Sequence, residues 1–167
     1  MGPPTPHSKW CSTMFLLRVC QALNEHKVPF AIVGGHAVAL HGAVRGTIDI
    51  DFVIQWNKTN LLNAEQAIND IGLVSRLPIT ASDVFENRDQ YIKERNLIAW
   101  NFYNPERQDE QLDLIISYDL GPNQSKTLSV ESTHVPILDI NSLIDMKTES
   151  GRPQDLADVE ALKELSS

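Results

Sequence analysis

The chain has 167 residues, of which 42% are hydrophobic and 22% charged, a composition typical of one globular domain. Its formal net charge of −8 repels polyanions, so a nucleic-acid partner would need a local basic patch. No apolar run approaches the roughly 20 residues that span a bilayer, and no signal-peptide core or myristoylation motif is present. We therefore expect a cytoplasmic protein that does not enter a membrane.

The N-terminal part predicts a disordered tail followed by a helix. Residues 1–7 contain three prolines, and Ser8 can cap a helix that ends near His26. The two cysteines, Cys11 and Cys20, are nine positions apart and fall on different faces of this helix. A disulfide between them is not expected, which favours a reducing compartment.

The next segment predicts a strand, a turn and a short helix. Residues 30–33 form a short apolar run after Pro29, and the glycine pair Gly34–Gly35 follows directly. Residues 36–41 predict a helix that Gly42 ends. A glycine turn of this kind lets a phosphate approach backbone N–H groups, although an ordinary strand-to-helix turn has the same pattern.

Two acids lie one residue apart on the second predicted strand, residues 48–54. Strand alternation puts Asp49 and Asp51 on one face and Ile48, Ile50 and Phe52 on the other. Residues 61–71 then predict a helix that Gly72 terminates.

A third acid follows on a predicted hairpin. The polar residues 83–95 leave a surface helix and a mobile loop both open. Residues 97–103 and 111–117 predict two antiparallel strands, and Asp113 faces away from the apolar side of the second. That strand can lie beside the one that carries Asp49 and Asp51.

The chain ends with a strand at residues 134–138 and helices at 141–149 and 153–165. We expect a single α/β domain over residues 8–167, with a mixed sheet of about five strands flanked by helices.

The three acids suit divalent cations. Magnesium is held by one or two carboxylates together with substrate phosphates, and three strand-borne acids can hold two ions. Two solvated acids at a strand end are the alternative for Asp49 and Asp51. An EF-hand is excluded because Val53 and Ile54 occupy positions that need an oxygen ligand and glycine, and no Walker lysine follows the glycines.

The motifs resemble the nucleotidyltransferases of the DNA polymerase β superfamily, in particular the small bacterial branch akin to the AbiEii-type toxins. The matching elements span about residues 30–160: Gly34–Gly35, the strand Arg45-Gly46-Thr47-Ile48-Asp49-Ile50-Asp51, Asp113, Lys147, and the run from Arg152 to Asp158. The resemblance departs at Gly35, where the superfamily often has serine, and at Gln154, where a basic residue is usual.

The resemblance implies roles for individual residues. Asp49 and Asp51 would bind two Mg²⁺ or Mn²⁺ ions, and Asp113 would complete one metal site and accept the proton of the acceptor hydroxyl. The nucleoside triphosphate would contact a further set of residues: Gly34, Gly35, His36, Arg45, Thr47 and Lys147. Alternatives remain open, because Lys147 can be a surface lysine, Thr47 and Arg45 can brace the strand, and His36 can simply pack.

Several other residues have two open interpretations. Asp155 and Asp158 form a solvated helix face, or Asp155 orients Lys147. His36 and His41 are five residues apart and do not make a zinc pair, so each packs or contacts a base. Trp56 and Trp100 pack in the core or border a base pocket.

We expect a metal-dependent transfer of a nucleoside monophosphate from a nucleoside triphosphate to a hydroxyl of an RNA, a protein in a toxin system, or a small molecule. An RNA acceptor would need a cluster of basic side chains: Arg76, Arg88, Lys93 and Arg95. The short chain leaves room for a partner subunit or a homodimer to complete the site. The rival interpretation is a catalytically silent module that binds a nucleotide or a protein.

Overall fold

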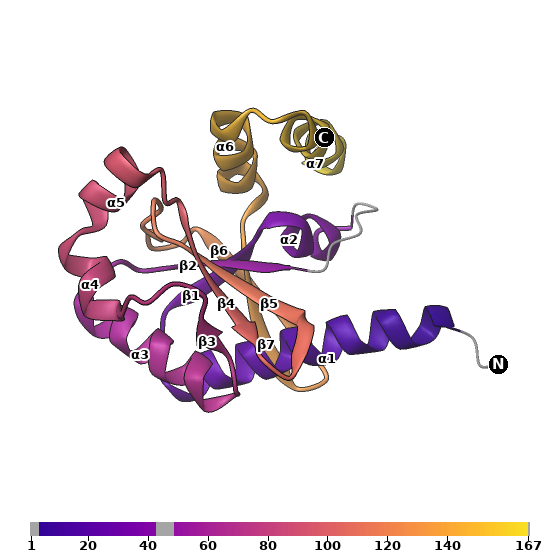
Figure 1. Ribbon diagram of the computed structural model, residues 1–167. Helices are drawn as coiled ribbons and strands as arrows, with labels where there is room; N and C mark the ends of the chain where they lie inside the picture. Colours follow the sequence, from indigo (N-terminus) through magenta and orange to yellow (C-terminus); the bar gives the residue numbers. More distant parts are fainter. Residues whose placement is uncertain (1–3, 43–48, 167) are drawn as a thin grey trace.

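A single mixed β-sheet organises the computed structural model, which describes residues 4–42 and 49–166 (Figure 1). Its order is β3-β4-β5-β2-β1-β7-β6. The strands are β1 (Phe30–Val33), β2 (Ile50–Ile54), β3 (Val74–Ser75), β4 (Ala99–Asn104), β5 (Arg107–Ile115), β6 (Ser125–Val130) and β7 (Thr133–Leu138). The helices are α1 (Pro4–Glu25), α2 (Gly34–Leu40), α3 (Lys58–Asp70), α4 (Ala81–Glu86), α5 (Arg88–Arg95), α6 (Ile140–Ser150) and α7 (Pro153–Ser166).

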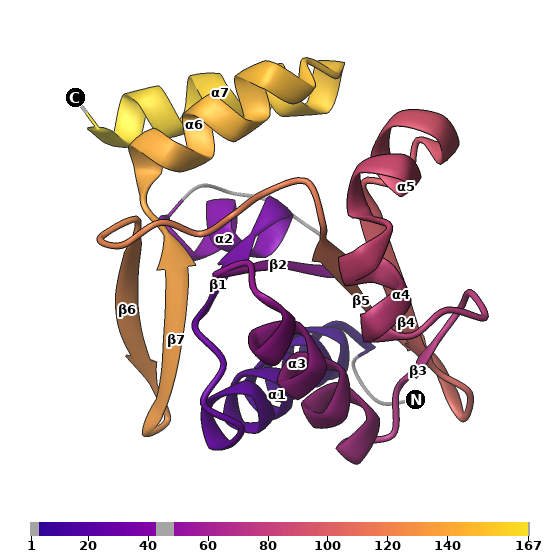
Figure 2. The ribbon, with the colours of Figure 1, turned by 90° about the vertical axis from the view of Figure 1, so that its left-hand side faces the viewer.

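The helices cover both faces of the sheet. In Figure 2, α1 and α3 lie below β1 and β2, whereas α2 and the hairpin of α6 and α7 lie above them. β2 pairs in parallel with β5, and β1 pairs in parallel with β7; the other neighbours are antiparallel. The predicted mixed sheet flanked by helices is confirmed.

The sheet has seven strands where the sequence predicts about five. The two additional strands, β3 and β6, are its edges. β3 has only two residues, and most of β6 is exposed. Edge strands of this kind carry no continuous apolar run, so pattern analysis misses them.

Two helical segments also differ from the prediction. α1 begins at Pro4, before the predicted cap at Ser8, because proline is tolerated in a first helical turn. The sequence left both a surface helix and a mobile loop open for the polar segment 83–95. The structure shows helices there, α4 and α5, which meet at Asn87. A capping box between Thr80 and Asp83 starts α4.

The core lies where the apolar faces of the central strands meet the helices. All four residues of β1 are buried, and the ring of Phe30 in β1 meets that of Phe52 in β2 edge-to-face at 6.5 Å. Trp100 and Phe102 of β4 are also fully buried. In the parts of the chain that the structure describes, no helix is both long and apolar enough to traverse a bilayer. The opposite face of these same strands carries the polar side chains described next.

Candidate active site

The pairing of β2 with β5 brings two acids together. The parallel register places Asp51 directly opposite Asp113, and the two carboxyl groups are hydrogen-bonded to each other. Asp49 lies one residue before β2 and interacts electrostatically with both of them. The structure therefore brings Asp113 next to Asp51 and close to Asp49, although Asp113 lies more than sixty positions after both of them in the chain.

Gly34 makes room for this cluster. The register of β1 and β2 places Val33 opposite Asp51, so the first residue of α2 faces the Asp51 carboxyl group. A Cβ atom at Gly34 would lie 2.9 Å from Cγ of Asp51, closer than real Cβ contacts allow. The backbone of Gly34 also has φ of +69°, a region that disfavours other residues. Glycine is needed here both for the bend and for the close approach of Asp51.

The cluster has an excess of negative charge. Burial, then the charge of Asp113, the hydrogen bond to it and the charge of Asp49 together raise the pKa of Asp51 to about 7, while Lys147 opposes them. Burial and then the charge of Asp113 raise the pKa of Asp49, which Arg76 partly offsets. Near neutral pH Asp51 therefore favours a bound proton or a bound cation.

The donor set fits magnesium. All three side chains offer carboxylate oxygens, the ligands that Mg²⁺ prefers, and Mg²⁺ takes the rest of its shell from water and substrate phosphates. Within residues 4–42 and 49–166, no group of three or more His, Cys, Asp or Glu side chains is placed so that it could hold a metal ion by itself. A bound phosphate would therefore have to supply further oxygens, as is usual for this ion.

Asn101 is a site residue that the sequence analysis missed, and Arg76, which the sequence suggested only for an RNA acceptor, lies next to it. Nδ2 of Asn101 donates to Oδ1 of Asp113 at 2.7 Å, and Nε of Arg76 donates to Oδ1 of Asn101 at 2.7 Å. Asn101 lies opposite Asp113 because an irregularity between Tyr103 and Asn104 shifts the register of β4 on β5. The amino-acid pattern contains no signal for that shift.

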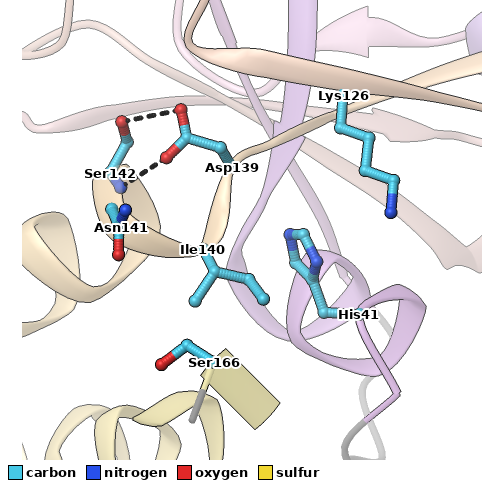
Figure 3. A pocket seen from close by; sticks show the side chains of 7 residues that line it. All are labelled: His41, Lys126, Asp139, Ile140, Asn141, Ser142 and Ser166. Carbon is cyan, nitrogen blue, oxygen red and sulfur yellow. Dashed lines mark hydrogen bonds between the residues drawn. The ribbon is translucent and has the colours of Figure 1, made fainter.

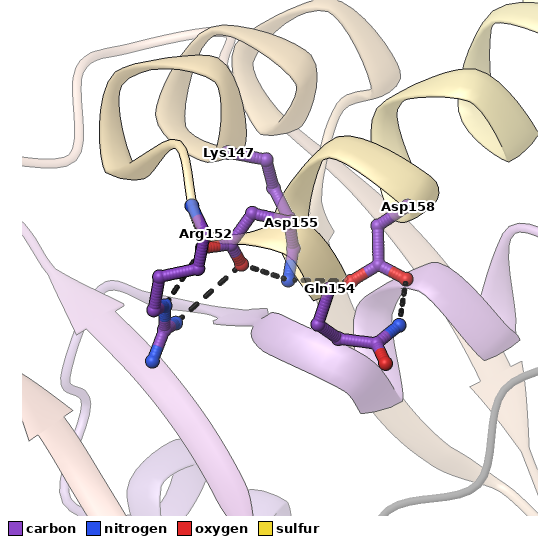
Figure 4. Close-up of polar contacts among 5 residues, drawn as sticks. All are labelled: Lys147, Arg152, Gln154, Asp155 and Asp158. Carbon is purple, nitrogen blue, oxygen red and sulfur yellow. Dashed lines mark hydrogen bonds and ion pairs between the residues drawn. The ribbon is translucent and has the colours of Figure 1, made fainter.

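Lys147 lies in the buried interface of the C-terminal helices. Its Nζ atom lies 2.9 Å from Oδ2 of Asp158 and 3.4 Å from Oδ1 of Asp155, as Figure 4 shows. Lys147, Asp155 and Asp158 are each at most 7% exposed. The interpretations of Lys147 as a surface lysine and of the two acids as a solvated face were therefore wrong. The alternative, in which Asp155 orients Lys147, matches these contacts.

Arg152 adds a second cation at the same place. Its Nε atom donates to Oδ2 of Asp155 at 2.8 Å, yet its side chain remains 76% exposed (Figure 4). Burial raises the pKa of Asp155, but hydrogen bonds from Arg152 and Ser150 and the charges of Lys147 and Arg152 outweigh it and lower this pKa to about 2. The Asp51 charge is among the causes that raise the pKa of Arg152, after its hydrogen bond and charge interaction with Asp155. Arg152 and Lys147 thus act electrostatically on the acid cluster.

Gln154, where a basic residue is usual, contacts a buried acid of its own helix. Its Nε2 atom donates to Oδ1 of Asp158 at 3.2 Å (Figure 4).

The remaining predicted nucleotide contacts are only partly described. Arg45 and Thr47 lie outside the described residues. His36 is half-buried in the first turn of α2, beside the buried Gly35. His41, at the other end of this helix, has its Nε2 atom 2.7 Å from the carbonyl oxygen of Leu138, a packing contact.

The tryptophans take different places. Trp100 is fully buried and donates from Nε1 to Oγ of Ser75 at 2.8 Å, so it belongs to the core and does not border a base pocket. Trp56 is half-buried and stacks on Phe85 with ring centroids 6.2 Å apart. The guanidinium of Arg88 covers the Trp56 ring at 4.3 Å.

A pocket of about 530 Å³ lies apart from the acids (Figure 3). It is bounded by the end of α2, by β6 and by the first turn of α6, and the described residues that line it are His41, Lys126, Asp139, Ile140, Asn141, Ser142 and Ser166. Asp139 caps α6 by accepting from the backbone N–H of Ser142 at 2.7 Å. None of the three clustered acids is among these lining residues.

Sequence comparison finds no match, whereas structure comparison finds proteins with a similar fold. No known family profile matches the chain, and no curated protein matches it in sequence. The fold is similar to that of an antigenic nucleotidyltransferase-like protein from Paracoccidioides brasiliensis, with 18% identity and a TM-score of 0.58 over 90% of this chain and 74% of that one.

Two antibiotic-modifying proteins are similar as well. The lincosamide antibiotic adenylyltransferase LnuA, solved with lincomycin bound, has 14% identity and a TM-score of 0.62 over 91% of this chain and 96% of its own. The antibiotic-resistance factor ANT(2'')-Ia has 15% identity and a TM-score of 0.58 over 92% and 82%. None of these three is described as a toxin, so they lend no support to the toxin-like branch. The structural likeness shows that the chain has the polymerase β-like fold of nucleotidyltransferases.

Proposed function

We propose that the protein is a divalent-metal-dependent nucleotidyltransferase that moves a nucleoside monophosphate from a nucleoside triphosphate to a hydroxyl group. The observation that carries this proposal is the contact between Asp51 and Asp113 across β2 and β5, directly in front of Gly34. An acid pair of this kind has no stabilising value in the free protein, since burial and mutual repulsion raise the pKa of Asp51 to about 7. A site that is costly to fold is typical of a functional centre.

The three acids would have different roles in metal binding and proton transfer. Asp49 and Asp51 would hold two Mg²⁺ or Mn²⁺ ions, and Asp113 would share one of them. Such ions neutralise phosphate charge and lower the pKa of a bound hydroxyl. Asp113 then accepts the proton of the acceptor hydroxyl, whose oxygen forms a bond to the α-phosphorus. The bond from that phosphorus to the bridging oxygen breaks, and pyrophosphate leaves with the bond's electron pair.

The triphosphate would lie between the glycine turn and the C-terminal helices. Gly34 makes the bend that begins α2 beside Asp51, Gly35 follows it in the first turn of that helix, and Lys147 and Arg152 supply positive charge close to Asp51. Lys147 forms ion pairs with two buried acids, so it would act on the phosphates mainly through its positive charge and without direct contact. Arg152 is largely exposed and can turn toward a phosphate. His36, Arg45 and Thr47 remain candidate nucleotide contacts.

A small hydroxyl-bearing molecule is the acceptor that we favour. LnuA was solved with lincomycin bound, and ANT(2'')-Ia was solved in complex with adenylyl-2''-tobramycin. The match to this second ANT(2'')-Ia structure covers 86% of its chain. The net charge of −8 disfavours a polyanionic acceptor. Arg76 and Arg88, which an RNA site would need together, are each anchored on a different ring, those of Tyr103 and Trp56. A protein acceptor in a toxin system is the less favoured option.

The proposal can be tested with labelled nucleoside triphosphates and Mg²⁺. Each triphosphate is offered with a panel of hydroxyl acceptors (aminoglycosides, lincosamides, an RNA pool and the protein itself), and pyrophosphate release and label transfer are measured. We expect transfer by the wild type, none by Asp51→Asn, and full transfer by Asp109→Asn. Asp109 is a matched control, because it lies on the same strand as Asp113, is exposed and pairs only loosely with Arg107 at 3.4 Å.

The rival, a silent binding module, predicts a different result. In that case calorimetry would show binding of nucleotide and Mg²⁺ while no acceptor receives label. Transfer that persists unchanged in Asp51→Asn would overturn the proposed mechanism.

A further inference from the structure

Asn101 connects Asp113 to Arg76 through two short hydrogen bonds. Its amide nitrogen donates to Oδ1 of Asp113, and its amide oxygen accepts from Nε of Arg76, each at 2.7 Å. Arginine can only donate hydrogen bonds, so the amide oxygen of Asn101 must face Arg76. The amide nitrogen must then face Asp113, which means that Arg76 determines the orientation of the donor.

Arg76 is itself held in place, although it is exposed to solvent. Its backbone N–H donates to the carbonyl oxygen of Asn101 at 3.0 Å, and its guanidinium lies 4.4 Å from the centre of the Tyr103 ring. These contacts fix both ends of a long side chain that would otherwise sample many rotamers. The guanidinium is therefore preorganised for its bond to Asn101.

Asp113 receives this support from the side that Asp51 does not occupy. β5 lies between β2 and β4, so Asp51 contacts Asp113 from one neighbouring strand and Asn101 contacts it from the other. Without Asn101 the carboxyl group could rotate more freely, because among the hydrogen bonds of residues 4–42 and 49–166 Asn101 is the donor on the side away from Asp51. Side chains that hold metal-binding carboxylates in this way commonly change affinity or activity by about 10- to 100-fold when they are removed.

We propose that Asn101, held by Arg76, is a positioning residue that fixes the carboxylate of Asp113 for metal binding and for proton acceptance. This inference rests on the proposed nucleotidyl transfer and adds two residues to its site. Neither of them touches the nucleotide in this role: Asn101 acts through Asp113, and Arg76 acts through Asn101.

The test uses Asn101→Leu, Arg76→Met and the double variant. Mn²⁺ affinity is measured by calorimetry, and kcat and KM for the triphosphate are measured by pyrophosphate release. We expect Asn101→Leu to weaken Mn²⁺ binding and to lower kcat, each by about 10- to 100-fold, while KM for the triphosphate changes by less than about threefold. Asn101→Ala, which removes both amide groups with a smaller side chain, should show the same pattern and replaces Asn101→Leu if the latter does not fold.

The double variant separates positioning from simple charge. If Arg76 acts through Asn101, adding Arg76→Met to Asn101→Leu causes no further loss. If Arg76 acts directly through its charge on Asp49, the two effects multiply, and the connection through Asn101 is refuted. Arg88→Met is the matched control, because Arg88 makes the same kinds of contact as Arg76. Its guanidinium lies 4.3 Å from the centre of an aromatic ring, and its Nε atom donates at 2.6 Å, but the acceptor is the backbone oxygen of Ile116. It should leave both readouts unchanged.

The outcomes distinguish this inference from the proposed function. Wild-type protein that binds Mn²⁺ but transfers no nucleotide contradicts the function, whereas the Mn²⁺ titrations of the variants still decide the role of Asn101. Variants that retain wild-type Mn²⁺ affinity and wild-type kcat refute the positioning role and leave the function intact.

Discussion

Replacing Asp51 by asparagine should make the metal-free protein more stable while it removes activity. The reason is the buried position of Asp51 against Asp113, which raises its pKa from 3.8 to about 7 in the folded state. In the unfolded chain the group has its ordinary pKa and ionises freely. Folding above neutral pH therefore requires an ionised carboxylate beside another one.

The sign and the pH window follow from the raised pKa. Below about pH 4 the group is protonated in both states, so it does not oppose folding. As the pH rises from about 4 to about 7, the unfolded chain loses the proton first, and stability falls. A shift of about three pKa units corresponds to at most about 4 kcal/mol, which is reached above pH 7. Asparagine carries no charge at any pH, so Asp51→Asn should recover about 2–4 kcal/mol at pH 8 and almost nothing at pH 4.

The assay is urea-induced unfolding of both proteins at several pH values in the presence of EDTA, with Asp109→Asn as the control that should follow the wild type. Saturating Mg²⁺ should raise the free energy of unfolding of the wild type at pH 8 but not that of Asp51→Asn. If Asp51→Asn is no more stable than the wild type at pH 8, or if its advantage does not depend on pH, the account of the acid pair is wrong.

Further predictions concern the glycine bend, the buried lysine and the metal. Gly34→Ala should lower the free energy of unfolding by about 1–3 kcal/mol and abolish transfer, because its Cβ would displace Asp51. The control is Gly72→Ala, because Gly72 has φ of +94° but a Cβ there would meet no heavy atom within 4 Å. In urea unfolding this control should show only the destabilisation caused by the unfavourable φ, and it should keep its activity. Lys147→Met should cost about 3–5 kcal/mol, because it removes the buried cation that Asp155 and Asp158 share, whereas Lys163→Met on the exposed side of α7 should cost less than about 0.5 kcal/mol in the same assay. Removal of divalent cations with EDTA should stop pyrophosphate release and added Mg²⁺ or Mn²⁺ should restore it; release that persists in EDTA would contradict metal dependence.

Local pattern was sufficient for the elements that carry the acids. The apolar run before Gly34 predicts β1, and alternation along residues 48–54 predicts that Asp49 and Asp51 share a face, because side chains of a strand alternate with a period of two. The paired β2 and β5, with Asp113 on the second, have the arrangement that these patterns predict. Edge strands such as β6 were missed, because a strand that is solvated carries no such pattern.

Only the tertiary structure decided which side chains meet. Alternation determines the face of Asp113 but not its register against Asp51, and the irregularity in the β4–β5 hairpin alone brings Asn101 opposite Asp113. The burial of Lys147 between Asp155 and Asp158 depends in the same way on how α6 folds back on α7. Sequence periodicity therefore determined the direction of each side chain, whereas strand register and helix packing, which arise from contacts between distant segments, determined its partners.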